Sequence, residues 1–361
     1  MLVFLAVVIF IGVALELYAY VDGTKHISFR CKPDKLYTEP GETITVSAEM
    51  SNSGRMPISY ASAAIAFPAN AKLPENMTTQ KEQFIQWVET DFHLRGRQIV
   101  TKSLQVKLDK RGVHFFKGAK VARGDFLGLY QMAETYPDQI PVMVYPKALE
   151  SEALRSAIGA YCGDIIAKRH LLRDPVLQMG VREYAGNEPM KTISWTQTAR
   201  RGQLMVREFD YTRDMSCTVL LALDGWQPSD EEKLDNCCRI VRSVCEELTS
   251  RNVNVNFYTN GSLINLSNGK QSMWSCTASK GNMSNILHAL ALLHLAPVRR
   301  QGLQMAVSAV RASDRNTAFV IVALRKTESI QQMAETIREK SGMETLVLLE
   351  SDFNYTEKER S

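Results

Sequence analysis

The chain has 361 residues, of which 45% are hydrophobic and 23% are charged, and its formal net charge is +4. This length suits two or three compact domains, each with its own core, and the composition excludes a mainly disordered chain. The small net charge excludes the strongly basic surface of a typical nucleic-acid-binding protein, so we expect no nucleic-acid partner. Seven cysteines without a recurrent spacing predict free thiols and a reducing compartment.

The N-terminal segment is almost uncharged. Residues 1–15 carry no charge, and the apolar stretch resumes after Glu16 and continues to Val21. Because about 20 apolar residues cross a bilayer, residues 1–21 predict a transmembrane anchor in contact with membrane lipid. A buried core helix is the alternative, and a signal peptide is disfavoured because no basic residue precedes Lys25. The basic residues from Lys25 onward place the remaining chain in the cytoplasm, at the cell membrane.

Short β-type runs separated by turn residues fill the next part of the chain. Residues 43–50 alternate between apolar and polar side chains, residues 51–54 form a turn-type break, and residues 58–67 resume the β-type pattern. Such patterning predicts an all-β sandwich domain, which we assign to residues 28–146.

Apolar runs alternate with helical stretches in the C-terminal part. The runs are 219–223, 253–258, 318–324 and 345–349, and the helical stretches include 231–248 and 330–340. Continuous apolar strands separated by helices predict a mostly parallel sheet that is covered on both faces. We therefore expect a doubly wound α/β domain over residues 213–352.

The segment between these domains, residues 174–212, is dense in Arg, Glu, Tyr and Trp. Asn187 can cap a helix that has Pro189 in its first turn and runs toward Arg201, where Gly202 offers a stop. A strand is expected from Leu204 onward.

Three pieces of this segment occur in a fixed order: Val-Arg-Glu-Tyr-Ala-Gly at 181–186, Lys-Thr-Ile-Ser-Trp at 191–195 and Ala-Arg-Arg-Gly-Gln-Leu-Met-Val-Arg-Glu at 199–208. Together they resemble the signature of a bacterial domain-of-unknown-function family, number 58, although Asn187 stands for the family's usual Asp and Lys191 for its usual Arg. The resemblance implies a membrane-anchored multidomain protein with an immunoglobulin-like sandwich and a C-terminal half similar to a von Willebrand factor type A domain. It also implies a MoxR-type AAA ATPase as partner.

A type A domain that holds Mg²⁺ uses an Asp-x-Ser-x-Ser loop, because this hard cation needs converging oxygen ligands. Here the loop reads Asp-Gly-Trp-Gln-Pro at 224–228, so both hydroxyl positions are lost. We expect a degenerate site in which Asp224 serves a turn or caps a helix, with no metal and no cofactor. His288 and His294 are expected on one helix, six residues apart, where they cannot share a metal.

No motif of a hydrolase, a nucleotide site or a paired-cysteine zinc site is present, so we expect no enzymatic activity. The expected function is a membrane-anchored, non-catalytic adaptor or scaffold that works with a MoxR-type AAA ATPase and an unknown client protein. A metal-dependent ligand-binding or adhesion module and an unrecognised hydrolase are the alternatives.

The candidate interaction residues come from the signature: Arg182, Glu183, Tyr184, Trp195, Arg200, Arg207 and Glu208. They suit a docking surface, because Trp, Tyr and Arg are enriched in binding hot spots. A charge network that only orients the segment against the α/β domain is the alternative.

Overall fold

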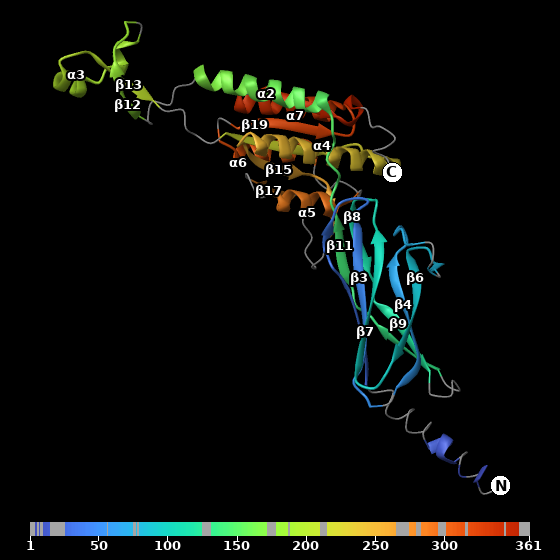
Figure 1. Cartoon of the computed structure of the whole chain (residues 1–361). Coiled ribbons are helices and arrows are strands. Elements are labelled where there is room, and N and C mark those ends of the chain that lie inside the picture. Colours follow the sequence, from blue (N-terminus) through green and yellow to red (C-terminus); the bar gives the residue numbers. More distant parts are fainter. Residues whose placement is uncertain are drawn as a thin grey trace.

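In the computed structural model, a β-sandwich is followed by an α/β layer and by a small unit that carries the signature residues (Figure 1). The structure describes residues 4–5, 7, 10–14, 26–55, 57–74, 77, 79–124, 131–171, 178–186, 188–209, 215–264, 274–278, 283–294, 301–314, 317–342 and 344–353. In Figure 1 the sandwich and the signature unit lie on opposite sides of the α/β layer.

The predicted fold class, which begins with a transmembrane helix, is wrong. Among the described residues, no helix is long and apolar enough to cross a membrane. Most of the predicted segment 1–21 falls outside the described residues, and helix is assigned there only at residues 4–5, 7 and 10–14. The N-terminal region that the structure describes consists mostly of β-strands, and helices mixed with strands follow later.

The sandwich is built mainly from antiparallel strand pairs, with one parallel pair in its third sheet. One sheet has the order β1 (Ile27–Pro33), β3 (Thr43–Asn52), β7 (Gln98–Lys107). The second has the order β10 (Gln131–Tyr136), β9 (Ala119–Gly124), β4 (Ile58–Pro68), β6 (Ile85–Leu94), β5 (Thr79–Lys81). A third, with β2 (Tyr37–Thr38), β11 (Ile140–Val144) and β8 (Gly112–Phe116), lies at the end facing the α/β layer. Because every second residue of β3 is buried, as the alternation of 43–50 predicted, this strand lines the sandwich core.

The α/β layer contains a five-stranded sheet with the order β17-β15-β14-β19-β20. The strands are β17 (Trp274–Ala278), β15 (Asn254–Thr259), β14 (Ser216–Ala222), β19 (Ala318–Ala323) and β20 (Thr345–Leu349). Neighbours are parallel except β17, which runs antiparallel to β15. The predicted runs 219–223, 253–258, 318–324 and 345–349 are therefore strands, and β19 is buried along its whole length.

Helices cover both faces of this sheet. Buried residues of α2 (Glu152–Leu171), α4 (Glu231–Ser250) and α5 (Ser284–Leu292) share one core with the odd-numbered residues of β14. On the other face, α6 (Gly302–Ala312) and α7 (Glu328–Ser341) share a core with Leu220 and Ala222. Helix α2, for which the sequence patterns predict no element, belongs to this layer because its Leu154, Ile158 and Cys162 are buried against it.

The signature unit is a two-stranded antiparallel ribbon, β12 (Gln178–Glu183) and β13 (Met205–Phe209). Between the strands lie a 3₁₀ turn, η1 (Met190–Thr192), and the short helix α3 (Trp195–Arg201). The predicted helix from Asn187 to Arg201 is thus too long, because Ile193 forms a β-bridge with Val206 and holds the backbone extended before α3. Asn187 lies outside the described residues, whereas Gly202 ends α3 in the left-handed conformation, with φ of 70°, as expected.

Candidate functional site

The signature unit is held together by local contacts. Arg182 donates to Glu188 Oε1 at 2.5 Å, and the backbone N–H of Ala185 donates to Glu188 Oε2 at 3.1 Å. The hydrogen bond from Arg182 is the main reason why the pKa of Glu188 lies below its ordinary value. Tyr184 also joins this unit, because its N–H donates to Leu204 O at 2.9 Å and its hydroxyl donates to Gly186 O at 3.2 Å. These contacts shape the loop after β12 without using the α/β layer.

Several large side chains of the unit face solvent. Trp195 is 61% exposed, Met190 70% and Leu204 44%, and Ile193, by contrast, is only 3% exposed. Exposed apolar side chains that form a contiguous patch often mark a contact with a partner, whereas single ones are common on any surface. Sequence reasoning identified Trp195 but missed Met190 and Leu204, because no periodicity distinguishes them from core residues.

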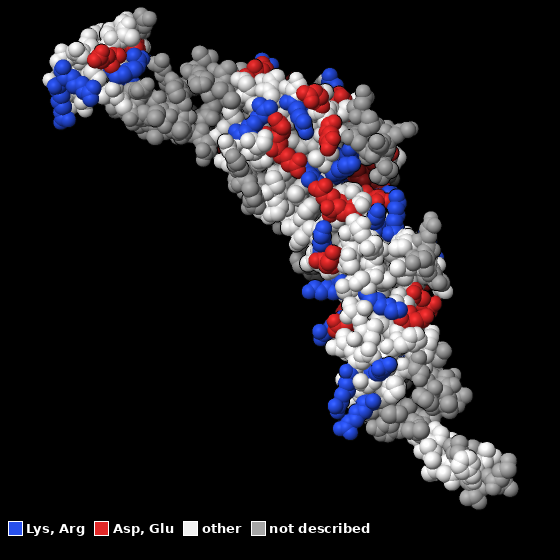
Figure 2. Space-filling view, in the orientation of Figure 1, with Lys and Arg blue, Asp and Glu red and all other residues white. Residues whose placement is uncertain are grey.

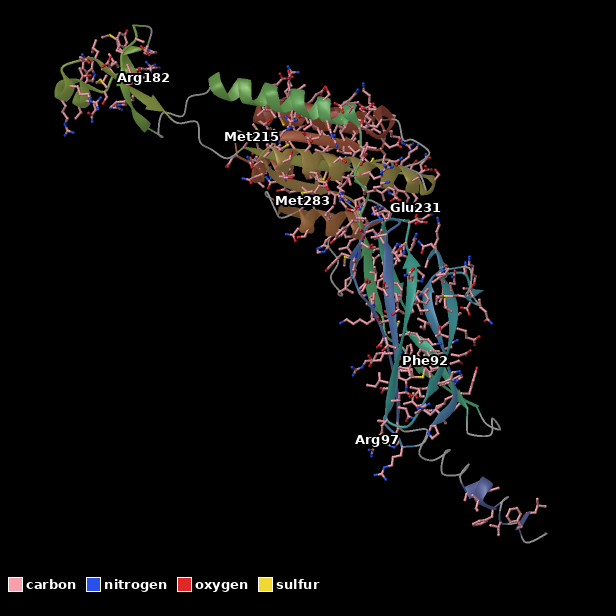
Figure 3. All side chains as sticks on the ribbon, viewed as in Figure 1. Phe92, Arg97, Arg182, Met215, Glu231 and Met283 are labelled. Carbon is pink, nitrogen blue, oxygen red and sulfur yellow. The ribbon has the colours of Figure 1, made fainter. Side chains whose placement is uncertain are left out.

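The charged signature residues lie on the same unit. Arg182, Glu183, Arg200 and Arg207 are exposed, and Figure 2 shows Lys and Arg side chains at the outer end of the unit. Arg182 is labelled in Figure 3, where it lies far from the sandwich. The side chain of Glu208 falls outside the described residues. The unit therefore presents arginine side chains together with an exposed Trp, the residue types that are enriched at the centres of protein interfaces.

Asp224 follows β14 at the carboxyl edge of the parallel sheet. Its carboxylate accepts hydrogen bonds from the N–H of Gly302 at 3.0 and 3.1 Å and from Asn260 Nδ2 at 3.3 Å. Asp224 thus caps the start of α6, which agrees with its expected capping role. Burial raises the pKa of Asp224, and hydrogen bonds from Gly302, Ser329 and Asn260 act in the opposite direction.

A bound metal ion needs several ligand side chains that converge on one point. Among the described residues, no group of three or more His, Cys, Asp or Glu side chains could hold one. His288 lies on α5, but His294 lies on the two-residue strand β18 (Leu293–His294), so the expectation that one helix carries both is wrong. The helix ends at Leu292, where β18 pairs with β16 (Ser262–Leu263).

A set of contacts missed by sequence reasoning joins the sandwich to the α/β layer. Arg111, whose side chain is 6% exposed, donates to Asp235 Oδ1 at 2.8 Å and to the carbonyl oxygens of Leu290 at 2.5 Å and Leu293 at 2.8 Å. Although burial alone would lower the pKa of the Arg111 guanidinium, nearby Cys238, Asp235 and Glu231 raise it. Arg111 is therefore a charged anchor that fixes the edge of β8 on α4 and α5.

Two further contacts strengthen this junction. Arg242 on α4 donates to Glu39 at 2.5 Å and to Pro146 O at 2.6 Å. The His288 ring packs against both the Tyr37 and Tyr145 rings, with centroid distances of 4.7 and 5.8 Å, and these two tyrosine rings stack on each other at 5.8 Å.

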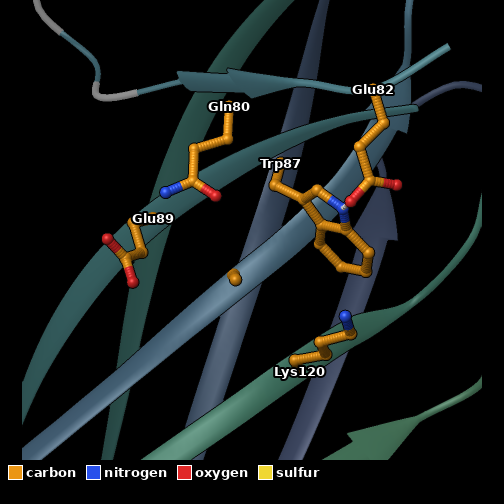
Figure 4. Close-up of a pocket in the computed structure, with 6 residues that line it drawn as sticks. Gln80, Glu82, Trp87, Glu89 and Lys120 are labelled. Atoms are coloured by element: carbon orange, nitrogen blue, oxygen red, sulfur yellow. Dashed lines mark hydrogen bonds between the residues drawn. The ribbon is translucent and has the colours of Figure 1, made fainter.

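A shallow hollow of about 130 Å³ lies on the sandwich (Figure 4). Trp87 Nε1 donates to Glu82 at 3.0 Å, and the Lys120 ammonium lies 4.4 Å from the centre of the Trp87 ring. These side chains satisfy one another, so the hollow is weaker evidence for a binding site than the exposed face of the signature unit.

Two solved structures that are similar to this chain match about a third of it. A non-cellulosomal cohesin from Archaeoglobus fulgidus is 12% identical, with a TM-score of 0.22, over 28% of this chain and 80% of that chain. The GAE domain of GGA2p from Saccharomyces cerevisiae is 14% identical, with a TM-score of 0.23, over 33% of this chain and 92% of that chain. At these TM-scores the likeness carries no argument about fold or function.

Sequence relatives are more informative for the signature. The uncharacterized protein YeaD of Bacillus subtilis (strain 168) is 25% identical over 129 residues, which are 35% of this chain and 31% of that protein. The chain thus matches about a third of the length of this curated relative. The model of the family described as "Protein of unknown function DUF58" matches residues 180–350, which include the signature and all five strands of the α/β sheet, but not α2. This part of the chain is therefore similar to the DUF58 family, and 129 residues of the chain are similar to the Bacillus protein.

Proposed function

We propose that the chain is a non-catalytic adaptor whose signature unit, residues 178–209, docks a protein partner, and that this partner is a MoxR-type AAA ATPase. The observation that carries the proposal is the exposure of Trp195, 61%, beside exposed arginine side chains on a unit stabilised by its own contacts. An exposed Trp that does not support its own fold is available to a partner, and Trp and Arg contribute more than most residues to binding energy. The identity of the ATPase rests on the family resemblance alone.

The C-terminal half is proposed to be a von Willebrand factor type A-like domain. The strand order supports this relationship, because β15 and β19 lie on opposite sides of β14 in a doubly wound sheet with one antiparallel strand at its edge. In this domain the Asp224 carboxylate already accepts three hydrogen bonds from protein donors. This arrangement favours the adaptor over the metal-dependent adhesion module, since a hard cation would compete with these donors.

The test is capture of a purified MoxR-type AAA ATPase by the full chain. Trp195→Ala and Arg200→Ala should each weaken capture by about 2 kcal/mol or more, roughly thirtyfold, while the unfolding midpoint stays near that of the wild type. Phe84→Ala is the matched control, because Phe84 is an aromatic residue of the sandwich that is 72% exposed. Equal weakening by the control, or unchanged capture by Trp195→Ala, would refute the docking role.

A further inference from the structure

A cleft of about 460 Å³ opens where the sandwich meets the α/β layer. Its walls come from the start of β8, from the loop between β14 and α4, and from the segments around β16 and β18. This position is at the carboxyl edge of a parallel sheet, at the segments that follow β14 and β15, and ligands of doubly wound folds bind outside this edge. Figure 3 labels Glu231 at this junction.

Most of the cleft wall is apolar. Trp226 is half-buried, Leu234 and Leu293 are buried, and Val113 and Ile264 are partly buried. A volume of this size with an apolar lining and a few polar groups is typical of small-ligand sites. An aliphatic or aromatic chain would therefore be accommodated in the cleft.

The free polar groups of the cleft are acceptors or acidic groups. The guanidinium of Arg111 is already neutralised by Asp235 and occupied by two backbone carbonyls. Glu231 is exposed at the cleft and presents its carboxylate there. Burial lowers the pKa of His114, which disfavours a positive charge on its ring.

His294 provides an independent observation. It lines the cleft, and its Nδ1 is shielded from solvent and has no hydrogen-bond partner in the part of the chain that the structure describes. A buried polar atom without a partner costs free energy that a bound donor recovers. Because Nε2 of a neutral imidazole can carry the proton, Nδ1 can accept a hydrogen bond from an N–H of the ligand after rotation of the ring turns Nδ1 toward the cleft.

We propose that this cleft binds an organic cation, an ammonium or guanidinium group on an apolar stem. The stem lies along Trp226, Leu234 and Leu293, the charged head faces Glu231, and one N–H donates to His294 Nδ1. Two sources supply such a group: a Lys or Arg side chain of a bound polypeptide and a free alkylamine. The proposal is independent of the docking role of the signature unit, because the two use different residues.

The experiment compares three probes of equal length on the full chain by isothermal titration calorimetry: hexylammonium, hexanol and hexanoate. Hexylammonium should bind saturably and at least tenfold more tightly than the other two. Hexanoate is a demanding comparison, because Lys110 and Lys147 line the adjoining hollow on the other side of Arg111. Binding of hexanoate as tight as that of hexylammonium, or absence of saturable hexylammonium binding, overturns the proposal.

Two variants locate the site. Glu231→Gln removes an exposed charge, so it should fold normally and weaken hexylammonium binding at least tenfold. Glu89→Gln on the sandwich, also an exposed carboxylate, should bind like the wild type. Unchanged binding by Glu231→Gln overturns the assignment even if hexylammonium binds elsewhere. A capped peptide with one Lys then identifies the source of the cation, and the same peptide with norleucine in place of Lys is its control for the ammonium group. Tighter binding of the Lys peptide than of hexylammonium supports a polypeptide. Weaker binding of the Lys peptide supports a free amine.

Discussion

Replacement of Arg111 by Met tests how the sandwich is joined to the α/β layer. The change keeps much of the apolar stem but removes the guanidinium, which leaves Asp235 without its partner and the carbonyls of Leu290 and Leu293 without their donor. Breaking a buried ion pair from one side costs about 3–5 kcal/mol. Because the Asp235 side chain is 33% exposed, water recovers part of this loss, and we expect a destabilisation near the lower end, about 3 kcal/mol.

The assay is urea unfolding of the full chain, followed by circular dichroism. Arg242→Met serves as the comparison, because the carboxylates that Arg242 contacts are 44% and 40% exposed, and exposed ion pairs contribute only about 0–1 kcal/mol. Asp235→Asn, alone and with Arg111→Met, separates the pairwise term from the loss of the carbonyl contacts. A cost below about 1 kcal/mol for Arg111→Met, or a larger cost for Arg242→Met, would show that Arg111 is not the main anchor.

Three other expectations follow from burial and close contacts. Burial lowers the pKa of His288 in the folded chain, so near and below pH 6.5 the unfolded chain binds more protons than the folded chain does. The free energy of unfolding should therefore decrease as the pH falls below 6.5. His288→Phe should reduce this pH dependence, which unfolding curves at several pH values would measure. Gly302→Ala should destabilise the chain by about 1–3 kcal/mol in a thermal scan, because the new methyl group would lie 2.1 Å from Asp224 Oδ2. Gly163→Ala is the control and should not destabilise the chain, because Gly163 has open space around it. Ile193→Ala should lower the free energy of unfolding of the signature unit by about 2–5 kcal/mol, because the Ile193 side chain is only 3% exposed. A loss as small as that expected for the exposed Trp195→Ala would contradict this burial.

Periodicity predicted the individual elements well where one face of an element is buried. The alternation over 43–50 and the β-type run 58–67 correspond to β3 and β4, and the helical stretches 231–248 and 330–340 correspond to α4 and α7. These patterns are strong because burial imposes them at every second residue of a strand or along one stripe of a helix. Helix α2 was missed because its apolar residues include Ala, Gly and Tyr among charged ones, so no clear stripe marks its buried side.

Local patterns failed where distant contacts decide the structure. The helix expected from Asn187 onward is interrupted at Ile193 by pairing with Val206, which no helix-propensity argument contains. Asp224 was expected to serve a turn or a helix cap, but only the fold reveals that the helix it caps begins 78 residues later. The apolar stretch at the N-terminus resembled a membrane span in composition, yet the described residues contain no helix that could cross a membrane.

The choice between a docking surface and an internal charge network for the signature depends on what holds the molecule together elsewhere. The sandwich is fixed to the α/β layer by Arg111, Arg242 and the ring of His288, none of which belongs to the signature. Helix α2 is fixed to the sheet by its buried side chains and by Tyr161, whose hydroxyl donates to Phe319 O at 2.8 Å. With 20 residues, α2 spans about 30 Å between the sandwich side of the layer and the segment that leads to the signature unit. Since these contacts already set the architecture, the exposed Trp and Arg side chains of the signature are better explained by a partner than by internal support.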